Sequence, residues 1–344
     1  MSESTNAGSP GFDFDTDKLA AYLEQQIEDF QGPLSATKFA GGQSNPTFLI
    51  DAQSGKYVLR RKPPGELLKS AHAVDREFKV MSALANTDVP VARAYHLCDD
   101  DSVIGSMFYL MEYIDGRVMW DPALPENTSE DRTVIYSEMN RVLAALHSVD
   151  IEAVGLSDYG RPGNYFERQI GRWSKQYRAS ETEVIADMET LMQWLPDNMP
   201  ADDGKVALAH GDFRLDNMMF HPTEPKVLAL VDWELSTLGH PYADLAYQCM
   251  QLRMDHEAVM SGLGGVARKI LGIPTEEEYV AQYCERMGID SIPNWNFYLA
   301  FSFFRFAPIL QGVKKRALDG NASSDKAMQM GELVKPLARM AVEL

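Results

Sequence analysis

The sequence is poor in cysteine. Its 344 residues include three, at positions 98, 249 and 284, which are far apart and have apolar residues nearby. A disulfide framework or a cysteine-based metal site needs more cysteines at closer spacing. These three are typical of core packing in a reducing compartment, so we expect a cytoplasmic protein.

A long hydrophobic run is also missing. The longest strongly apolar segment, Tyr298 to Leu310, is interrupted by Arg305 and is too short to cross a bilayer. The first 17 residues have no basic start and no apolar stretch, so we expect no secretory signal there. Their Ser, Gly and Asp content favours a flexible tail over residues 1–16.

Basic residues are outnumbered. The sequence has 32 Lys and Arg against 50 Asp and Glu, a formal net charge of −18. We therefore expect no nucleic-acid partner, because phosphate backbones require concentrated basic residues. Acidic surfaces favour cationic or neutral ligands by long-range steering. Two local basic clusters, at 60–62 and 314–316, either contact anions or belong to a solvated face or strand end.

The strongest chemical signal lies between residues 206 and 232. Short apolar runs at 206–209, 218–220 and 227–231 predict three strands. Asp212 and Asn217, five residues apart, occupy the loop after the first strand, and Asp232 follows the third. We expect these polar groups to meet at one end of the strand pair.

That combination suits phosphoryl transfer, in which the protein mainly positions ATP and neutralises its charge. Asp212 would orient the acceptor hydroxyl and receive its proton. Asn217 and Asp232 would hold magnesium, which takes few protein ligands besides phosphate oxygens. The alternative is that all three cap loop turns, as Asp and Asn often do; their joint spacing relative to the strands argues against it.

The N-terminal part reads as a helix followed by strands. Apolar spacing predicts a helix over 17–30, and strands are expected at 36–40, 47–51 and 56–60. The glycine-rich loop at 41–45 brings backbone N–H groups close to an anion such as the ATP phosphates. A simple Gly-Gly hairpin turn is the alternative.

These features resemble the aminoglycoside phosphotransferase and choline kinase superfamily, relatives of the protein kinases. The nearest likeness is to the phosphotransferase-like group that occurs alone in bacteria or fused ahead of acyl-CoA dehydrogenase domains in animals. The resemblance extends from about residue 35 to about residue 250 and is carried by Gly41–Asn45, Tyr57–Pro63, Ala71–Glu77, Leu208–Asn217, Leu230–Glu234 and His240–Tyr247.

The resemblance implies an α+β, two-lobed protein-kinase-like fold. The small β-rich nucleotide-binding lobe would cover residues 17–115, and the larger, mainly helical catalytic and acceptor-binding lobe residues 116–344. A helical insertion at about 159–203 would shape the acceptor pocket. Further helices are expected at 73–85, 129–149, 276–287, 295–318 and 324–342.

The resemblance also implies nucleotide contacts. Gly42, Ser44 and Asn45 would cover the phosphates. Arg60 stands where kinases usually have a Lys on the third strand, and its planar fork suits phosphate oxygens. Glu77 would be its helix partner; an ordinary lobe-stabilising ion pair is the alternative reading of these two residues.

The adenine site would lie in the segment 107–116, whose composition predicts a buried strand that ends in a turn. Met111 would line the back of the pocket, and the carbonyl of Glu112 and the N–H of Ile114 would bond the base. The alternative is a plain central strand followed by a loop.

Three residues around the catalytic Asp212 have expected roles by resemblance. His210 would support the loop, and Asp244 would anchor it. Arg214 would lie near the γ-phosphate, or else face outward from the loop. Many aminoglycoside-directed enzymes have His in this neighbourhood, so Arg214 argues against antibiotic resistance.

The sequence therefore predicts an ATP-dependent, magnesium-dependent phosphotransferase acting on the hydroxyl of a small molecule. The favoured acceptor is a hydroxyacyl thioester, because of the subgroup's link to acyl-CoA dehydrogenases. An aminoglycoside or amino-alcohol kinase and a nucleotide-binding pseudokinase remain as alternatives, although Asp212, Asn217 and Asp232 are all present. Oligomeric state and any partnership with an acyl-CoA dehydrogenase stay open.

Overall fold

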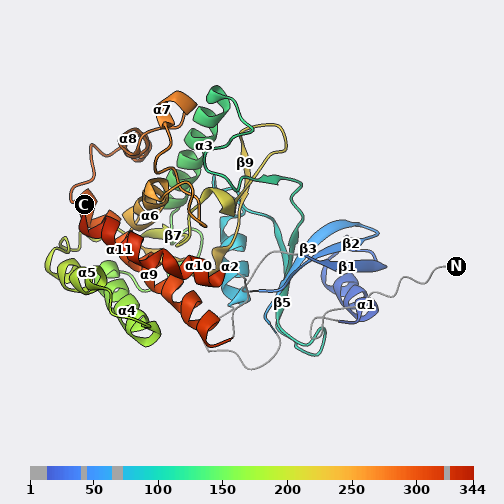
Figure 1. The fold of residues 1–344 in the computed structure, drawn as a ribbon. Helices are drawn as coiled ribbons and strands as arrows, with labels where there is room; N and C mark the ends of the chain where they lie inside the picture. Colours follow the sequence, from blue (N-terminus) through green and yellow to red (C-terminus); the bar gives the residue numbers. More distant parts are fainter. Residues whose placement is uncertain (1–13, 40–44, 64–72, 321–325) are drawn as a thin grey trace. The chain divides into compact units, whose positions relative to one another are not determined.

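The computed structural model describes residues 14–39, 45–63, 73–320 and 326–344. The chain divides into two compact units (Figure 1). The first, the N-terminal unit, comprises residues 1–115 and 229–234; the second, the C-terminal unit, comprises residues 116–228 and 235–344.

The N-terminal unit is built on a five-stranded antiparallel sheet in the order β1-β2-β3-β5-β4. Its strands are β1 (Leu34–Lys38), β2 (Thr47–Ala52), β3 (Gly55–Arg61), β4 (Ala94–Cys98) and β5 (Phe108–Glu112). Two helices accompany them, α1 (Thr16–Gln26) and α2 (Val74–Leu84).

The alternating direction of side chains along β3 explains how this unit presents Arg60. Successive side chains of a strand point to opposite faces of the sheet. Leu59 enters the apolar core with Leu19 and Leu23 of α1. Arg60 therefore lies on the opposite face, where α2 presents Glu77.

The spacing of the buried residues along helix α2 places Glu77 on its buried face. Its buried positions are Val74, Glu77, Val80, Met81 and Leu84, which recur at the three- and four-residue spacing of one helix face. A carboxylate at such a position must be paired, because an unpaired buried charge is costly.

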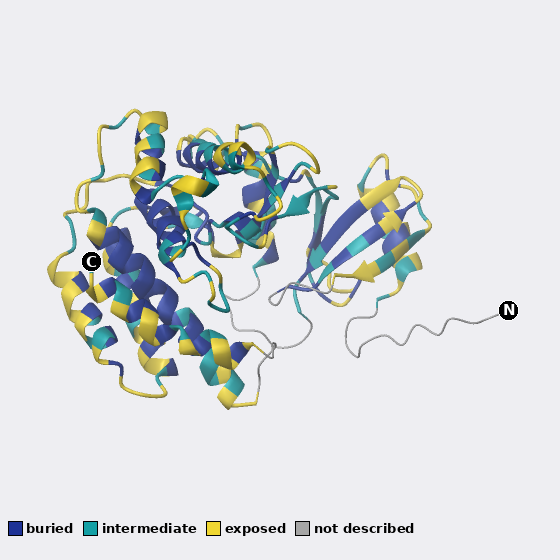
Figure 2. Cartoon of the chain, turned by 45° about the horizontal axis from the view of Figure 1, so that its top comes forward, coloured by how far each residue is buried: buried dark blue, intermediate teal, exposed yellow. Residues whose placement is uncertain are grey.

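The C-terminal unit is mainly helical. Its principal helices are α3 (Ser129–His147), α4 (Tyr165–Ser180), α5 (Ala186–Asp197), α6 (Tyr242–Arg253), α8 (Glu276–Met287) and α9 (Trp295–Leu318). Shorter ones are α7 (Arg268–Leu271), α10 (Ala327–Glu332) and α11 (Val334–Val342). Helix α9 packs against α4, α6, α10 and α11 and is buried without interruption from Phe297 to Pro308, and Figure 2 shows this buried core.

Two small sheets carry the loops of interest. Strand β7 (Ala207–Ala209) pairs antiparallel with β10 (Thr237–Gly239). Strands β6 (Arg117–Val118), β8 (Met218–Phe220) and β9 (Val227–Leu230) form a three-stranded sheet.

Most of the predicted elements are present, with three differences. The helix expected over 17–30 ends at Gln26, because Ile27 is extended (φ −126°, ψ 115°), and buried Phe30 reaches the core from the following turn. The strand expected at 36–40 covers Leu34–Lys38. The helix expected at 324–342 is divided into α10 and α11, since Pro336 has no N–H and is tolerated only in the first turn of α11.

Candidate active site

The loop after β7 has a backbone that only glycine fits well. Gly211 has a φ of +84°, and a Cβ there would lie 2.6 Å from the carbonyl oxygen of Leu235. Arg305 Nη2 donates to the Gly211 carbonyl at 2.5 Å. The close approach of these segments fixes the loop that presents Asp212.

Asp244 of α6 anchors the same loop, as expected. Its carboxylate, 1% exposed, accepts the backbone N–H of His210 at 2.6 Å and that of Gly211 at 2.9 Å. Burial alone would raise the pKa of Asp244, but His147 at 3.5 Å and the Gly211 N–H lower it overall. An ionised Asp244 therefore stabilises the loop by charge-assisted hydrogen bonds.

His210 is fully buried and supports the loop from within. Its Nδ1 accepts the backbone N–H of Asp212 at 3.2 Å. This contact agrees with the structural role expected for His210.

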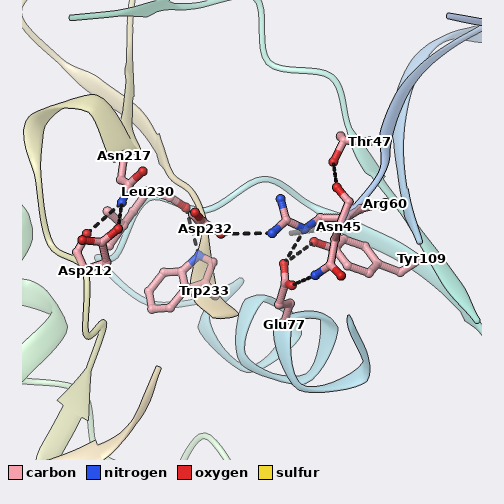
Figure 3. Close-up of polar contacts among 10 residues, drawn as sticks. All are labelled: Asn45, Thr47, Arg60, Glu77, Tyr109, Asp212, Asn217, Leu230, Asp232 and Trp233. Atoms are coloured by element: carbon pink, nitrogen blue, oxygen red, sulfur yellow. Dashed lines mark hydrogen bonds and ion pairs between the residues drawn. The ribbon is translucent and has the colours of Figure 1, made fainter. Parts of the chain in front are cut away.

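Asp212 is held in a defined orientation but stays accessible, with 21% of its side chain exposed. The Tyr247 hydroxyl donates to Oδ1 at 2.8 Å, and Asn217 Nδ2 donates to Oδ2 at 3.0 Å. Figure 3 shows the amide of Asn217 directed at Asp212. An ionised carboxylate has about four lone-pair sites, so Asp212 retains capacity for an acceptor hydroxyl.

Arg214 is not an outward-facing loop residue. Its Nη2 lies 2.5 Å from Asp216 Oδ2, and its Nε lies 3.6 Å from Asp212 Oδ1. The guanidinium is thus fixed beside the predicted base.

Tyr247 is the residue that the sequence did not single out for a role. It lies in the buried middle of α6, where its spacing is that of a core residue. Burial and the charge of Asp212 raise its pKa far above the ordinary value, so the phenol remains a neutral hydrogen-bond donor. The only sequence signal was its place in the His240–Tyr247 motif.

The N-terminal unit holds the predicted pair Arg60 and Glu77. Arg60 Nε lies 2.9 Å from Glu77 Oε2, and Arg60 Nη2 lies 3.0 Å from Asp232 Oδ1 (Figure 3). Glu77 also accepts Asn45 Nδ2 at 2.9 Å and the Tyr109 hydroxyl at 3.0 Å. The side-chain amide of Asn45 therefore supports Glu77.

Burial raises the pKa of Glu77, while Arg60 and the hydrogen bonds from Tyr109 and Asn45 oppose that shift. Burial alone would lower the pKa of Arg60, but Glu77 and Asp232 raise it overall. Arg60 is therefore a permanent, oriented positive charge.

Asp232 has an unusual backbone. Its φ is +65°, the left-handed region that non-glycine residues rarely adopt, although Asp and Asn tolerate it best. Its side chain is 36% exposed. Such conformations often occur at functional sites, where the surrounding structure over-determines them.

The predicted adenine-contacting residues lie at the end of β5. Met111 pairs with Val58 of β3, and Glu112 with Tyr57. The Glu112 N–H donates to the Arg93 carbonyl at 2.8 Å. Ile114 follows in the half-buried segment after the strand. Gly42 and Ser44 lie outside the described residues.

Asn217 and Asp232 each carry an oxygen of the kind that magnesium prefers. The Asn217 amide nitrogen bonds Asp212, so its carbonyl oxygen is the atom suited to a hard cation. Asp232 offers a partly exposed carboxylate. Across the described ranges, no group of three or more His, Cys, Asp or Glu forms a metal site by itself. Few protein ligands are what magnesium needs when phosphates supply the others.

Within the part of the chain that the structure describes, no helix has the length and apolarity needed to span a membrane.

Comparison with known proteins gives a consistent family match. Residues 35–280 match the family described as "Phosphotransferase enzyme family". The solved structure of a Ralstonia eutropha protein, assigned to the aminoglycoside phosphotransferases, is 52% identical with a TM-score of 0.89 and covers 96% of this chain and 98% of that one. Choline kinase from Cryptosporidium parvum, 12% identical with a TM-score of 0.62 and covering 96% of this chain and 95% of that one, shares the fold.

Two curated relatives contain a matching segment. Mouse acyl-CoA dehydrogenase family member 10 is 50% identical over 327 residues, which is 94% of this chain and 30% of that protein. Human acyl-CoA dehydrogenase family member 11 is 43% identical over 340 residues, which is 97% of this chain and 44% of that protein. The chain thus spans less than half the length of these relatives. The comparisons confirm the predicted resemblance and the kinase-like α+β fold.

Proposed function

We propose that this chain, which belongs to the phosphotransferase enzyme family, is an ATP-dependent phosphotransferase that moves the γ-phosphate of Mg-ATP to a hydroxyl of a small molecule. The observation that carries the proposal is Asp212, a partly exposed carboxylate held by Tyr247 and Asn217.

Each of the site residues has a separate role in the proposed reaction. Asp212 orients the acceptor hydroxyl and takes its proton as the oxygen bonds the γ-phosphorus and the bond to the ADP oxygen breaks. Asn217 and Asp232 would hold magnesium, which neutralises charge on the phosphate oxygens. Arg60, fixed by Glu77, provides a positive charge for the phosphates.

Other nucleotide contacts are proposed from the family pattern. Gly42, Ser44 and the backbone of Asn45 would cover the phosphates. Met111, the carbonyl of Glu112 and the N–H of Ile114 would receive the adenine. The half-buried placement of the last three leaves them partly accessible to a ligand.

For the acceptor we favour a hydroxyacyl thioester. The support is indirect: the curated relatives are named acyl-CoA dehydrogenase family members, and this chain matches only part of each. An amino-sugar or amino-alcohol acceptor is the second candidate, supported by the net charge of −18. A pseudokinase is disfavoured, because Asp212, Asn217 and Asp232 are all present.

The test is an ADP-release screen of purified protein with Mg-ATP and three acceptor classes: hydroxyacyl-CoAs, amino-alcohols and aminoglycosides. We expect saturable, acceptor-dependent ADP release with a hydroxyacyl-CoA and confirmation of a phosphate ester by mass spectrometry. Higher kcat/KM for an aminoglycoside would overturn the acceptor assignment. Nucleotide binding without turnover on any acceptor would favour the pseudokinase.

A further inference from the structure

A cavity of about 390 Å³ in the C-terminal unit adjoins the catalytic loop. Arg214, Leu215 and Asp216 form part of its wall, only two to four residues after Asp212. Part of the cavity wall therefore belongs to the same loop as the predicted base.

Most of the cavity wall is apolar and adaptable. Its principal apolar residues are Met119, Trp120, Met254, Met260, Phe306 and Met330. Methionine side chains are flexible and polarisable, so they adjust to ligands of varied shape. Trp120 is 77% exposed, which is unusual for so large an apolar side chain. Exposed apolar surface of this kind is typical of binding sites.

Two glutamines of α6 give the cavity polar points. Gln248 and Gln251 are one helical turn apart and both line the cavity. Gln248 is 2% exposed, and among the described residues neither its Oε1 nor Gln251 Nε2 has a hydrogen-bond partner. Leaving buried polar atoms unpaired costs free energy, so the pair is suited to a ligand that supplies the missing hydrogen bonds.

The charges of the wall exclude a polycationic ligand. Asp216 is the only carboxylate among the described residues lining the cavity, and Arg214 pairs with it. Lys326 adds a positive charge. Among the described lining residues, an amino-sugar with several ammonium groups would find only Asp216, which Arg214 already pairs, whereas an uncharged chain would find apolar contacts and two amides.

The cavity is also linked to the base by packing. Phe306 in its wall contacts the Tyr247 ring, with centroids 5.9 Å apart, and the Tyr247 hydroxyl bonds Asp212. A ligand that fills the cavity thus contacts Phe306, which packs against the side chain that orients the base.

We infer that this cavity binds the tail of the acceptor, an uncharged aliphatic chain carrying a carbonyl or hydroxyl group that Gln248 and Gln251 recognise. This inference rests on the proposed function, because it takes the ligand to be the acceptor. Binding of the aliphatic chain itself does not depend on turnover. Trp120 and the methionines set the preference for chain length.

The test uses a probe that has no hydroxyl and so cannot be phosphorylated. Octanoyl-N-acetylcysteamine and its butanoyl analogue are titrated by calorimetry into the protein with Mg and a non-hydrolysable ATP analogue. We expect saturable binding that is at least about tenfold tighter for the longer chain, because each buried methylene adds to affinity.

Three variants localise the binding. Trp120→Ala and Met260→Asp should raise the Kd of the octanoyl probe by about tenfold or more, since they remove or charge the apolar wall. Met287→Asp is the matched control, because Met287 is also a half-buried methionine but lies at the end of α8 and does not line this cavity. Melting temperatures establish that each variant folds.

The outcomes separate the two proposals. Loss of probe binding in Trp120→Ala and Met260→Asp, but not in Met287→Asp, supports the tail site even if no acceptor is turned over. Absence of binding to the parent protein, or equal binding by all variants, overturns the tail site even if phosphoryl transfer occurs.

Discussion

Asp212 receives hydrogen bonds on both carboxylate oxygens, from Tyr247 on Oδ1 and from Asn217 on Oδ2. This double restraint selects one orientation of the side chain. A base held in this way loses little freedom when the acceptor binds, which is where positioning contributes to rate. The spacing of Asp212, Asn217 and Asp232 was visible in the sequence, because catalytic loops follow strands that have a simple apolar pattern.

The first prediction concerns Asp232. Asp232→Asn keeps a residue that tolerates a φ of +65°, while it removes the charge offered to magnesium. We expect Mg-ATP affinity and turnover to fall together, by about tenfold or more. Isothermal titration with and without magnesium measures the affinity.

The control for Asp232 is Arg214→Ala, which changes a residue held by Asp216. Nucleotide binding should survive that change. Equal losses of Mg-ATP affinity in the two variants would contradict the assignment of Asp232 as a metal ligand.

The second prediction concerns pH. The folded state lowers the pKa of Asp244 below its ordinary value of 3.8, so the folded protein binds fewer protons there than the unfolded chain. The stability contributed by the ionised carboxylate is complete above that value and is lost as pH falls towards the folded-state pKa.

Asp244→Asn should therefore destabilise the protein by about 2 kcal/mol near neutral pH, since an amide cannot accept both backbone N–H groups as a carboxylate does. The difference in the free energy of unfolding between this variant and the parent should narrow below about pH 3.8. Urea unfolding across pH 3–7 measures it. Equal stability of the two proteins at pH 7 would sink this account.

Helix α6 shows why part of the site could not be predicted. It carries the anchor Asp244, the donor Tyr247 and the cavity residues Gln248 and Gln251. Its residues from Tyr242 to Met250 are all buried, so its sequence has no polar face to distinguish functional positions from core. Only the tertiary contacts reveal their roles.

Other elements differed in how clearly they were encoded. Helices α8 and α9 have the predicted bounds, and α8 begins with a capping box at Thr275, a local signal. Strands β4 and β10 were not predicted. Strand β10 has only three residues and pairs with the distant β7, and the pairing of β4 with β5 is irregular between Ala94 and His96. Pairing of that kind depends on tertiary context more than on local propensity.

The third prediction concerns the hydroxyl of Tyr247 on helix α6. Tyr247→Phe keeps the ring packing against Phe306 but removes the hydroxyl that donates to Asp212. We expect kcat to fall by about tenfold from less accurate positioning of the base, while KM for ATP stays unchanged. Steady-state kinetics separates the two constants, and a fall in ATP affinity with unchanged kcat would show that Tyr247 has another role.

At the scale of the whole molecule, the fold and the family were predictable and the acceptor was not. The motifs from Gly41 to Tyr247 gave the kinase-like fold, which the comparisons confirm. The cavity that we assign to the acceptor tail is lined by side chains from distant segments, such as Trp120, Gln248 and Met330, which share no motif.

The most direct test of phosphoryl transfer is the activity of Asp212→Asn on a verified acceptor. The variant should fold, because the Tyr247 hydroxyl can accept from the new amide as well as donate. It should bind Mg-ATP with almost unchanged affinity, since the proposed phosphate and metal contacts belong to other residues. Its kcat should fall by about 10²–10⁴-fold, as expected when a general base is removed. An Asp212→Asn protein with undiminished kcat would contradict the assignment of Asp212 and the mechanism built on it.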